Sequence, residues 1–162
     1  MATIRMPLFL DALDRKALEL LARDGRLSWA DLAAQLKLTG PSAAERVRKL
    51  EQRGVIRAYA AVLDPEMLGL DVTAFVAVRL GHPRDRDRFV KRIGELDGVL
   101  ECHHTAGDDD YLLKVRVANL RALEQFVAGE LKAIAGVIQT RTTIATSTSK
   151  EVLTPVPAGD EP

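Results

Sequence analysis

Four basic side chains are concentrated within eight residues of the chain, namely Arg46, Arg48, Lys49 and Arg53. Within the same stretch, Ala43, Val47 and Leu50 recur at i, i+4 and i+7, the spacing of one apolar helix face. The stretch therefore predicts a short amphipathic helix with a basic outer face. Such a face is either an ordinary solvated surface or a binding site for phosphate groups.

The ends of this helix are marked in the sequence. Thr39 or Ser42 can cap its N-terminus with a side-chain oxygen, and Ser42 with Glu45 also fits a capping box. Pro41 is tolerated only in a first turn, where its missing N–H costs nothing. Gly54 stands where a left-handed residue would end the helix.

A second short helix is predicted immediately before the basic one, over residues 28–36 with Ser28 as its cap. Only Lys37 and Leu38 separate the two helices, so together they form a helix-turn-helix, whose second helix enters the major groove of DNA. Lys37 occupies a turn position where glycine is usual. A positive φ there would cost on the order of 1 kcal/mol.

This motif predicts which side chains contact double-stranded DNA. Arg48 and Lys49 suit phosphate contacts, and Glu45 would accept from cytosine N4 if it faces the bases. Arg46 has an alternative, which is to turn inward and pair with a carboxylate of the preceding helix. The predicted DNA contacts are Ser28, Trp29, Thr39, Gly40, Pro41, Ser42, Ala44, Glu45, Arg46, Arg48 and Lys49.

The charge distribution supports a nucleic-acid-binding N-terminal half. The formal net charge is zero. However, residues 1–60 carry 11 Lys/Arg against 7 Asp/Glu, a net of +4, and the remainder carries 12 against 16, a net of −4. A basic module joined to an acidic one fits a DNA-binding domain fused to a domain of another kind.

The composition indicates a protein of the cytoplasm, associated with the nucleoid if it binds DNA. Apolar residues make up 47% and charged residues 28% of the 162, as in globular proteins. No run of 18 apolar residues predicts a membrane span, and the N-terminus lacks the pattern of a signal peptide. The single cysteine, Cys102, excludes an intramolecular disulfide and suits a reducing compartment.

The elements that position these residues fall into two domains of an α+β protein. Residues 10–25 predict a first helix capped by Asp11, which completes a three-helix (winged) helix-turn-helix domain over 1–54. Residues 55–63 predict a strand within a linker over 55–70. Beyond it, strands and helices alternate in the order βαββαβ, which predicts a ferredoxin-like α/β sandwich over 71–155. A flexible tail is expected over 156–162.

Strand alternation predicts that this sheet is covered on one face only. In the strand over 72–80, Val72, Val76, Val78 and Leu80 suit a helix-covered core, whereas Thr73, Phe75, Ala77 and Arg79 face the other way. A bare, partly apolar sheet face predicts a homodimer formed by sheet packing.

Two further clusters lie in the second domain. Gly107-Asp-Asp-Asp110 is either an ordinary hairpin turn or part of an amino-acid pocket, in which Gly107 lets backbone N–H groups approach a carboxylate and Asp108 or Asp110 accepts an ammonium group. On the strand before it, Cys102 and His104 share a face. A metal site would need a further ligand there, so no metal is predicted, and a pH-sensitive or ligand-facing His104 is favoured.

The chain resembles the Lrp/AsnC, or feast/famine, family of bacterial and archaeal transcription regulators. The resemblance runs from Leu10 to Pro155 and rests on the order and spacing of motifs: Leu10-Asp11 with Asp14 and Leu18, Asp24-Gly25-Arg26, Leu38-Thr39, Arg46-Val47 with Leu50, Gly54-Val55-Ile56, Gly69, Gly107-Asp108 with Asp110-Tyr111, Lys150 and Pro155. It implies that amino acids bind the second domain at contacts between dimers, and that dimers assemble into octamers around which DNA wraps.

The resemblance favours the pocket over the plain hairpin turn. The expected effector-binding residues are Gly107, Asp108, Asp110, Tyr111, His104, Thr140 and Thr142, the two threonines completing the pocket from a neighbouring subunit. The predicted function is a sequence-specific regulator of amino-acid-related metabolism that responds to an amino acid, without a cofactor and without catalysis. The alternatives are an architectural DNA binder that responds to no ligand and a small enzyme using the His/Asp cluster, which lacks a nucleophile motif, a phosphate loop and a metal triad.

Overall fold

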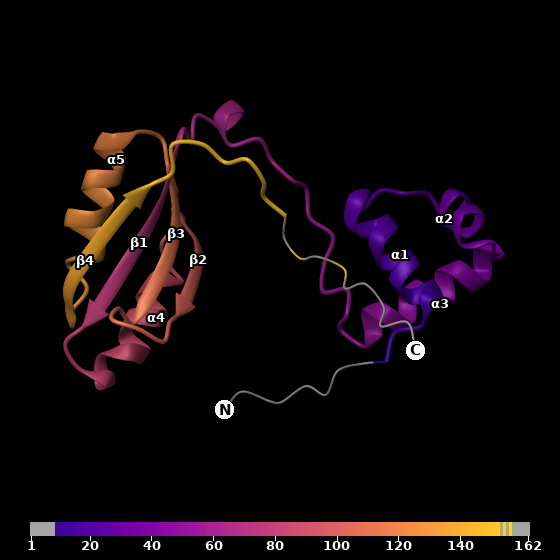
Figure 1. Ribbon diagram of the computed structural model, residues 1–162, viewed down its shortest axis with the longest axis horizontal. Helices are drawn as coiled ribbons and strands as arrows, with labels where there is room; N and C mark the ends of the chain where they lie inside the picture. The colour runs from indigo at the N-terminus through magenta and orange to yellow at the C-terminus, as the bar shows by residue number, and fades with distance from the viewer. Residues whose placement is uncertain (1–8, 153, 155, 157–162) are drawn as a thin grey trace. The chain divides into compact units, whose positions relative to one another are not determined.

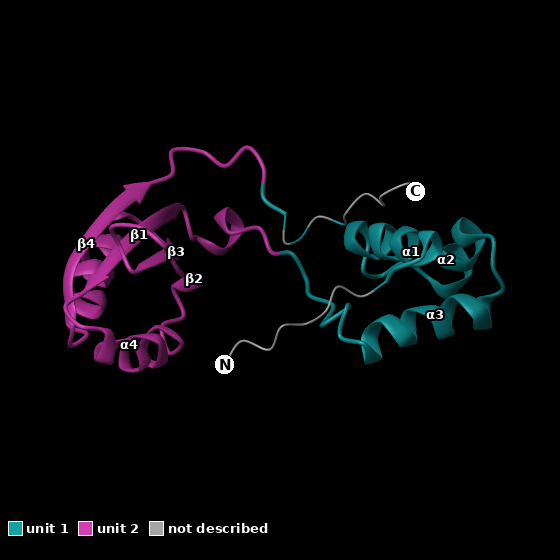
Figure 2. Cartoon of the chain, turned by 60° about the horizontal axis from the view of Figure 1, so that its bottom comes forward, with its two compact units in different colours: residues 1–62, 151–162 teal, residues 63–150 magenta. Residues whose placement is uncertain are grey.

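The computed structural model describes residues 9–152, 154 and 156. Among these residues the chain divides into two compact units, residues 9–62 with 151, 152, 154 and 156, and residues 63–150 (Figure 2). The tail predicted over 156–162 lies outside the described residues from position 157 onward. Within the described residues, no helix is long and apolar enough to cross a membrane.

The first unit contains the three predicted helices, α1 (Ala12–Arg23), α2 (Trp29–Leu36) and α3 (Gly40–Gln52). Their N-caps are Asp11, Ser28 and Thr39, each of which accepts a hydrogen bond from a backbone N–H of the first turn. Thr39, and not Ser42, therefore caps α3. Buried small and aliphatic side chains hold the three helices together: Ala17, Leu32, Ala33, Leu36, Ala43 and Val47.

The tight turn of the helix-turn-helix has the predicted backbone strain. Lys37 has a φ of 55° and ends α2 in the left-handed conformation. The N–H of Leu38 then donates to the carbonyl of Ala33 at 2.9 Å, which closes the turn. At the other end of α3, Gly54 has a φ of 71°, as a helix-terminating glycine requires.

The predicted strand over residues 55–63 is wrong for the single chain. These residues form no strand, and the segment that follows contains only the short 3₁₀ helix η1 (Glu66–Leu68). A strand needs a neighbour for its N–H and C=O groups, and the described chain offers none here. Instead Tyr59 holds the segment against the first unit, since its hydroxyl donates to Glu51 at 2.9 Å and its ring lies 3.5 Å from the position of a Cβ at Gly25.

The second unit is an antiparallel sheet of four strands, β1 (Val72–Leu80), β2 (Val99–His104), β3 (Tyr111–Val117) and β4 (Val137–Ile144), in the order β2-β3-β1-β4 (Figure 1). The short helix η2 (Pro83–Asp85) and α4 (Arg86–Ile93) join β1 to β2, and α5 (Leu120–Gln125) with η3 (Phe126–Leu131) joins β3 to β4. The predicted βαββαβ order and ferredoxin-like arrangement are confirmed.

Both helices pack on the same face of the sheet, as strand alternation predicted. Ala74, Val76 and Val78 of β1 are fully buried against side chains such as Phe89 of α4 and Leu123 of α5. On the opposite face, Phe75 of β1 and Leu112 of β3 remain 38% and 37% exposed. We call this opposite face the open sheet face. It is made of Thr73, Phe75, Ala77, Arg79, Glu101, His103, Leu112, Lys114, Arg116, Gln139, Arg141 and Thr143.

The last helix differs from the continuous helix expected between Asn119 and about Ala135. Asn119 does cap α5, but the backbone then widens to a π-helix over η3. Phe126 and Leu131 are both buried, although residues five apart in an α-helix point about 140° away from each other. The i→i+5 bonding of a π-helix turns both toward the core.

Candidate nucleic-acid interface and ligand loop

The outer face of α3 presents a mixture of free and paired charge. Arg48 and Lys49 are exposed, and Arg48 forms an ion pair with Glu45 one turn earlier. Among the residues that the structure describes, Lys49 has no ion pair. At the start of α2, Trp29 is 51% exposed. The exposed positive charges of α3 are therefore available to an anionic partner, with Glu45 limiting the freedom of Arg48.

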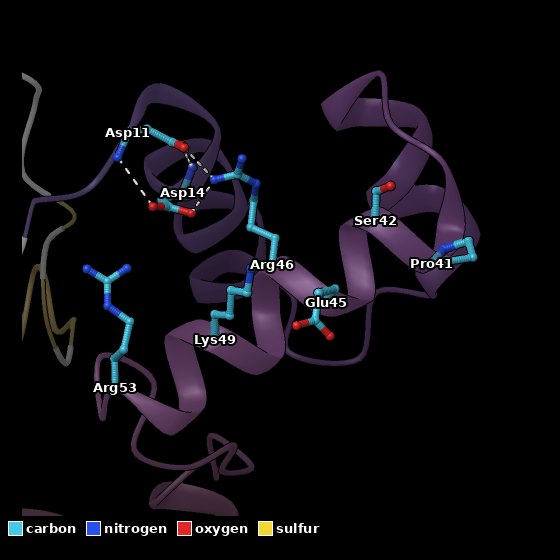
Figure 3. A pocket seen from close by; sticks show the side chains of 8 residues that line it. All are labelled: Asp11, Asp14, Pro41, Ser42, Glu45, Arg46, Lys49 and Arg53. Atoms are coloured by element: carbon cyan, nitrogen blue, oxygen red, sulfur yellow. Dashed lines mark hydrogen bonds and ion pairs between the residues drawn. The ribbon is translucent and has the colours of Figure 1, made fainter.

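Arg46 takes the inward position that the sequence left as an alternative. Its Nη1 lies 2.6 Å from Asp11 Oδ2 and 2.5 Å from Asp14 Oδ1, as the dashed lines in Figure 3 show. Asp11 and Asp14 also form a reciprocal capping box at the start of α1. One guanidinium thus ties α3 to the N-terminus of α1.

The electrostatics of this cluster favour its charged form. Hydrogen bonds to Asp11 and Asp14 raise the pKa of Arg46. Burial alone would raise the pKa of Asp11, but the N–H of Asp14 and the guanidinium of Arg46 outweigh burial and hold that pKa below its ordinary value. The cluster lines a shallow depression between α1 and α3, together with Pro41, Ser42, Glu45, Lys49 and Arg53 (Figure 3).

The hydroxyls at the helix starts are already engaged. The Ser28 hydroxyl donates to Asp31 at 2.5 Å and accepts from the backbone N–H of Asp31 at 3.1 Å. The Thr39 hydroxyl donates to Ser42 at 2.9 Å. To contact DNA, these groups would use their remaining acceptor or donor capacity while they continue to cap α2 and α3.

The loop over residues 107–110 joins β2 to β3 and forms hydrogen bonds with the end of β1. The backbone N–H of Asp110 donates to the carbonyl of Val78, and the next N–H of β1, that of Leu80, donates to the Asp110 carboxylate at 2.8 Å. The side chain of Asp110 therefore replaces a strand carbonyl. This contact engages a carboxylate that the sequence analysis predicted to bind a ligand.

Four residues outside the predicted effector site make contacts that hold the same loop, namely Arg79, Thr105, Asp109 and Arg141. Asp109 pairs with Arg141 of β4 at 2.6 Å, and the Nε of Arg79 donates to the Asp108 carbonyl at 2.8 Å. The hydroxyl of Thr105 donates to the Asp109 carbonyl at 2.6 Å. Sequence reasoning missed Arg79, Asp109 and Arg141, because only the register between β1 and β4 brings the two arginines to the same end of the sheet.

The other expected effector-binding residues are spread over the second unit. The Nε2 of His104 lies 2.8 Å from the guanidinium of Arg86, and the His104 ring lies 5.2 Å from that of Tyr111. Tyr111 itself is buried and packs on Phe89. Thr140 and Thr142 pair with Val78 and Val76, so in one chain they lie on the helix-covered side of the sheet.

The cysteine and histidine cluster has no metal-binding geometry in the described part of the chain. Cys102 is exposed, and no group of three or more His, Cys, Asp or Glu side chains among the described residues is placed to hold an ion. Although the residue as a whole is exposed, partial desolvation by its neighbours raises the pKa of the Cys102 thiol, which lowers its reactivity.

Comparison with known proteins settles the family of this chain. A model of the AsnC-type helix-turn-helix domain matches residues 10–51, and a model of the Lrp/AsnC ligand binding domain matches residues 73–154. The chain belongs to the Lrp/AsnC family of transcriptional regulators. The first matched range contains α1 and α2 with most of α3, and the second contains the sheet from the second residue of β1 onward, with the loop over 107–110.

Individual relatives agree along most of the chain. The leucine-responsive regulatory protein of Escherichia coli K12 is 36% identical over 144 residues, which are 88% of each protein. A transcriptional regulator of Neisseria meningitidis solved with L-Met has a TM-score of 0.86 at 30% identity, covering 89% of this chain and 94% of its own. A feast or famine regulatory protein of M. tuberculosis complexed with L-methionine has a TM-score of 0.85 at 36% identity, covering 92% and 100%.

The Arg46 cluster predicts a specific pH dependence of stability. Because the folded-state pKa of Asp11 lies below its ordinary value of 3.8, ionised Asp11 stabilises the first unit above pH 3.8, and this contribution is lost as the pH falls through the lower pKa. We expect Asp11→Asn to lower the free energy of unfolding by about 1 kcal/mol at neutral pH, since a half-exposed ion pair is partly screened.

The measurement is urea unfolding followed by the fluorescence of Trp29, the one tryptophan of the chain, at a series of pH values. The difference between Asp11→Asn and the wild type should shrink as the pH drops below 3.8. Glu19→Gln, which changes an acid of the same helix, is the control. A difference that stays constant with pH would show that the Asp11 charge does not stabilise this unit.

The Asp110 carboxylate is predicted to stabilise the second unit, whether or not it also binds a ligand. Asp110→Ala leaves the N–H of Leu80 without its acceptor and should destabilise the second unit by about 1–3 kcal/mol. Asp110→Asn retains an acceptor oxygen and should cost clearly less. Urea unfolding followed by far-UV circular dichroism measures both, with Asp108→Ala as a neighbouring control expected within about 0.5 kcal/mol of the wild type.

Proposed function

We propose that this regulator contacts DNA through the N-terminal part of α3 and the start of α2. The observation that carries the proposal is the exposed charge of α3 beside a capped helix start in a helix-turn-helix unit. Arg48 and Lys49 bind phosphates, while Thr39, Gly40, Pro41, Ser42, Ala44 and Glu45 face the groove. Ser28 and Trp29 contact the backbone. Arg46, held by two carboxylates, sets the position of α3 and makes no primary phosphate contact.

This division of labour predicts the salt dependence of DNA binding. Arg48→Ala and Lys49→Ala should each reduce the slope of log K against log salt concentration by about one unit and weaken binding to all sequences alike. Fluorescence anisotropy with a labelled duplex at several salt concentrations measures the slope. Lys16→Ala removes an exposed charge from α1 and should leave the slope unchanged. An unaltered slope in Arg48→Ala would remove that residue from the phosphate contacts.

We further propose that the loop over 107–110 binds the charged groups of an amino-acid effector. A Cβ at Gly107 would meet no atom within 4 Å, and the φ of Gly107 is not positive. Neither space nor backbone conformation in the single chain therefore requires glycine at this position. Among the described residues, the exposed carboxylate of Asp108 has neither a hydrogen bond nor an ion pair. Asp108 thus accepts the ammonium group, while the backbone near Gly107 receives the carboxylate. The two structural relatives solved with methionine support this class of ligand.

The proposal includes the assembly of the protein. The open sheet face combines exposed apolar side chains with charges of both signs, which suits packing against a second copy by a twofold axis. Dimers would then assemble further, up to an octamer, and Tyr111, His104, Thr140 and Thr142 would border a pocket completed by neighbouring subunits. The protein would act in the cytoplasm on the nucleoid, regulating amino-acid-related genes without catalysis.

The effector proposal predicts a selective response to one or a few amino acids. Size exclusion with light scattering and thermal unfolding, run with each of the twenty amino acids, should reveal a shift in mass or melting temperature for the effector. Asp108→Asn should weaken that amino acid's binding by about tenfold, because a charge-assisted hydrogen bond is worth about 1.5–3 kcal/mol. Asp97→Asn, an exposed acid elsewhere in the unit, should bind normally. No shift with any amino acid would favour a ligand-independent DNA binder.

A further inference from the structure

The loop over 107–110 is held by two arginines that belong to the open sheet face. Arg79 of β1 and Arg141 of β4 pair in register with Gln139 and Ala77, so both arginines leave the sheet on the side that no helix covers. From there Arg79 reaches the Asp108 carbonyl and Arg141 reaches the Asp109 carboxylate. The proposed effector loop is therefore attached to the face on which a second copy is proposed to pack.

The two partners of the ion pair differ greatly in exposure. The side chain of Asp109 is 11% exposed, whereas that of Arg141 is 67% exposed in the single chain. A carboxylate with so little access to water depends on its partner, and removing that partner is costly. Separating Asp109 from Arg141 would leave a nearly buried carboxylate without its counter-ion, so the position of the loop is energetically linked to a side chain of the open sheet face.

Packing of a second copy would also affect the Arg141–Asp109 ion pair, because it would cover the Arg141 side chain. Covering the open sheet face removes water from the exposed guanidinium of Arg141, and a desolvated charge needs its counter-ion more than a solvated one does. The packed state thus favours the loop conformation in which Asp109 and the Asp108 carbonyl meet the two arginines. An amino acid that binds this conformation would in turn favour packing, because coupling between two equilibria is reciprocal.

We propose that Arg79 and Arg141 are positioning residues that couple the conformation of the effector loop to packing of the open sheet face against a second copy of the chain. This inference rests on the proposed function, because it takes the effector loop and the dimer face from there. It adds how the two communicate, through the Arg141–Asp109 ion pair and the Arg79–Asp108 hydrogen bond.

The first test measures the dimer dissociation constant by dilution in sedimentation velocity, with and without L-methionine. In the wild type, methionine should lower this constant at least fivefold. In Arg141→Gln, methionine should bind within about threefold of its wild-type affinity by calorimetry, but the shift in the dimer constant should fall below twofold. Arg141→Lys, which keeps the charge, should restore part of the shift.

Arg116→Gln is the matched control, because it removes one positive charge from the same sheet face at the other end of β1, opposite Thr73. This variant should keep the full methionine-induced shift. A full shift in Arg141→Gln, or methionine binding to the wild type without any shift, would overturn the inference. Neither result affects the proposal that the loop binds an amino acid.

A second readout needs no ligand, so it tests the coupling even if methionine does not bind and the effector proposal fails. Amide hydrogen exchange of residues 107–110 is measured on dilute and concentrated protein. In the wild type, exchange in the loop should slow at least threefold on dimerisation, and in Arg141→Gln it should be the same at both concentrations. An amide exchange rate of the loop that is the same in the dilute and concentrated wild type would refute the coupling.

Discussion

The arrangement of the second unit depends on the one-sided covering of its sheet. In the strand order β2-β3-β1-β4, each helical connection joins two parallel strands across an antiparallel neighbour. Right-handed connections then place α4 and α5 on the same side. Aliphatic side chains such as Val76 and Val78 face the helices, and the alternate positions, with Phe75 among them, remain uncovered. The open face and the attachment of the loop to it both follow from this constraint.

In the first unit, the corresponding constraint is the crossing of α3 over α1. The basic side chains of a DNA-binding helix repel one another unless acidic side chains of the protein balance part of their charge. Arg46 is balanced by Asp11 and Asp14, which at the same time cap α1 and benefit from its positive end. Arg48 and Lys49 remain on the exposed side. The same helix thus separates one structural cation from those proposed to bind phosphates.

The linker between the units shows how a local pattern can mislead. The β-branched and aromatic residues after Gly54 have strand propensity, but propensity forms no strand without a partner for the backbone. Tyr59 instead docks on the first unit, and burial together with the neighbouring carboxylate of Glu51 raises its pKa to about 12. The hydroxyl therefore remains protonated and able to donate to Glu51 across the physiological range.

The sequence by itself determined the features that arise from local chemistry. Helix caps, the glycine that ends α3, the left-handed Lys37, strand alternation and the family motifs depend on a few neighbouring residues, and the structure contains them. Tertiary structure alone decided where the charged side chains of distant segments meet. Arg46 pairs with Asp11 and Asp14, which lie more than thirty residues away in the sequence, and the pairing of β4 with β1 brings Arg141 to Asp109. The widening of α5 into η3 likewise follows from which side chains the core must bury. Such contacts depend on packing and register, which local sequence patterns do not specify.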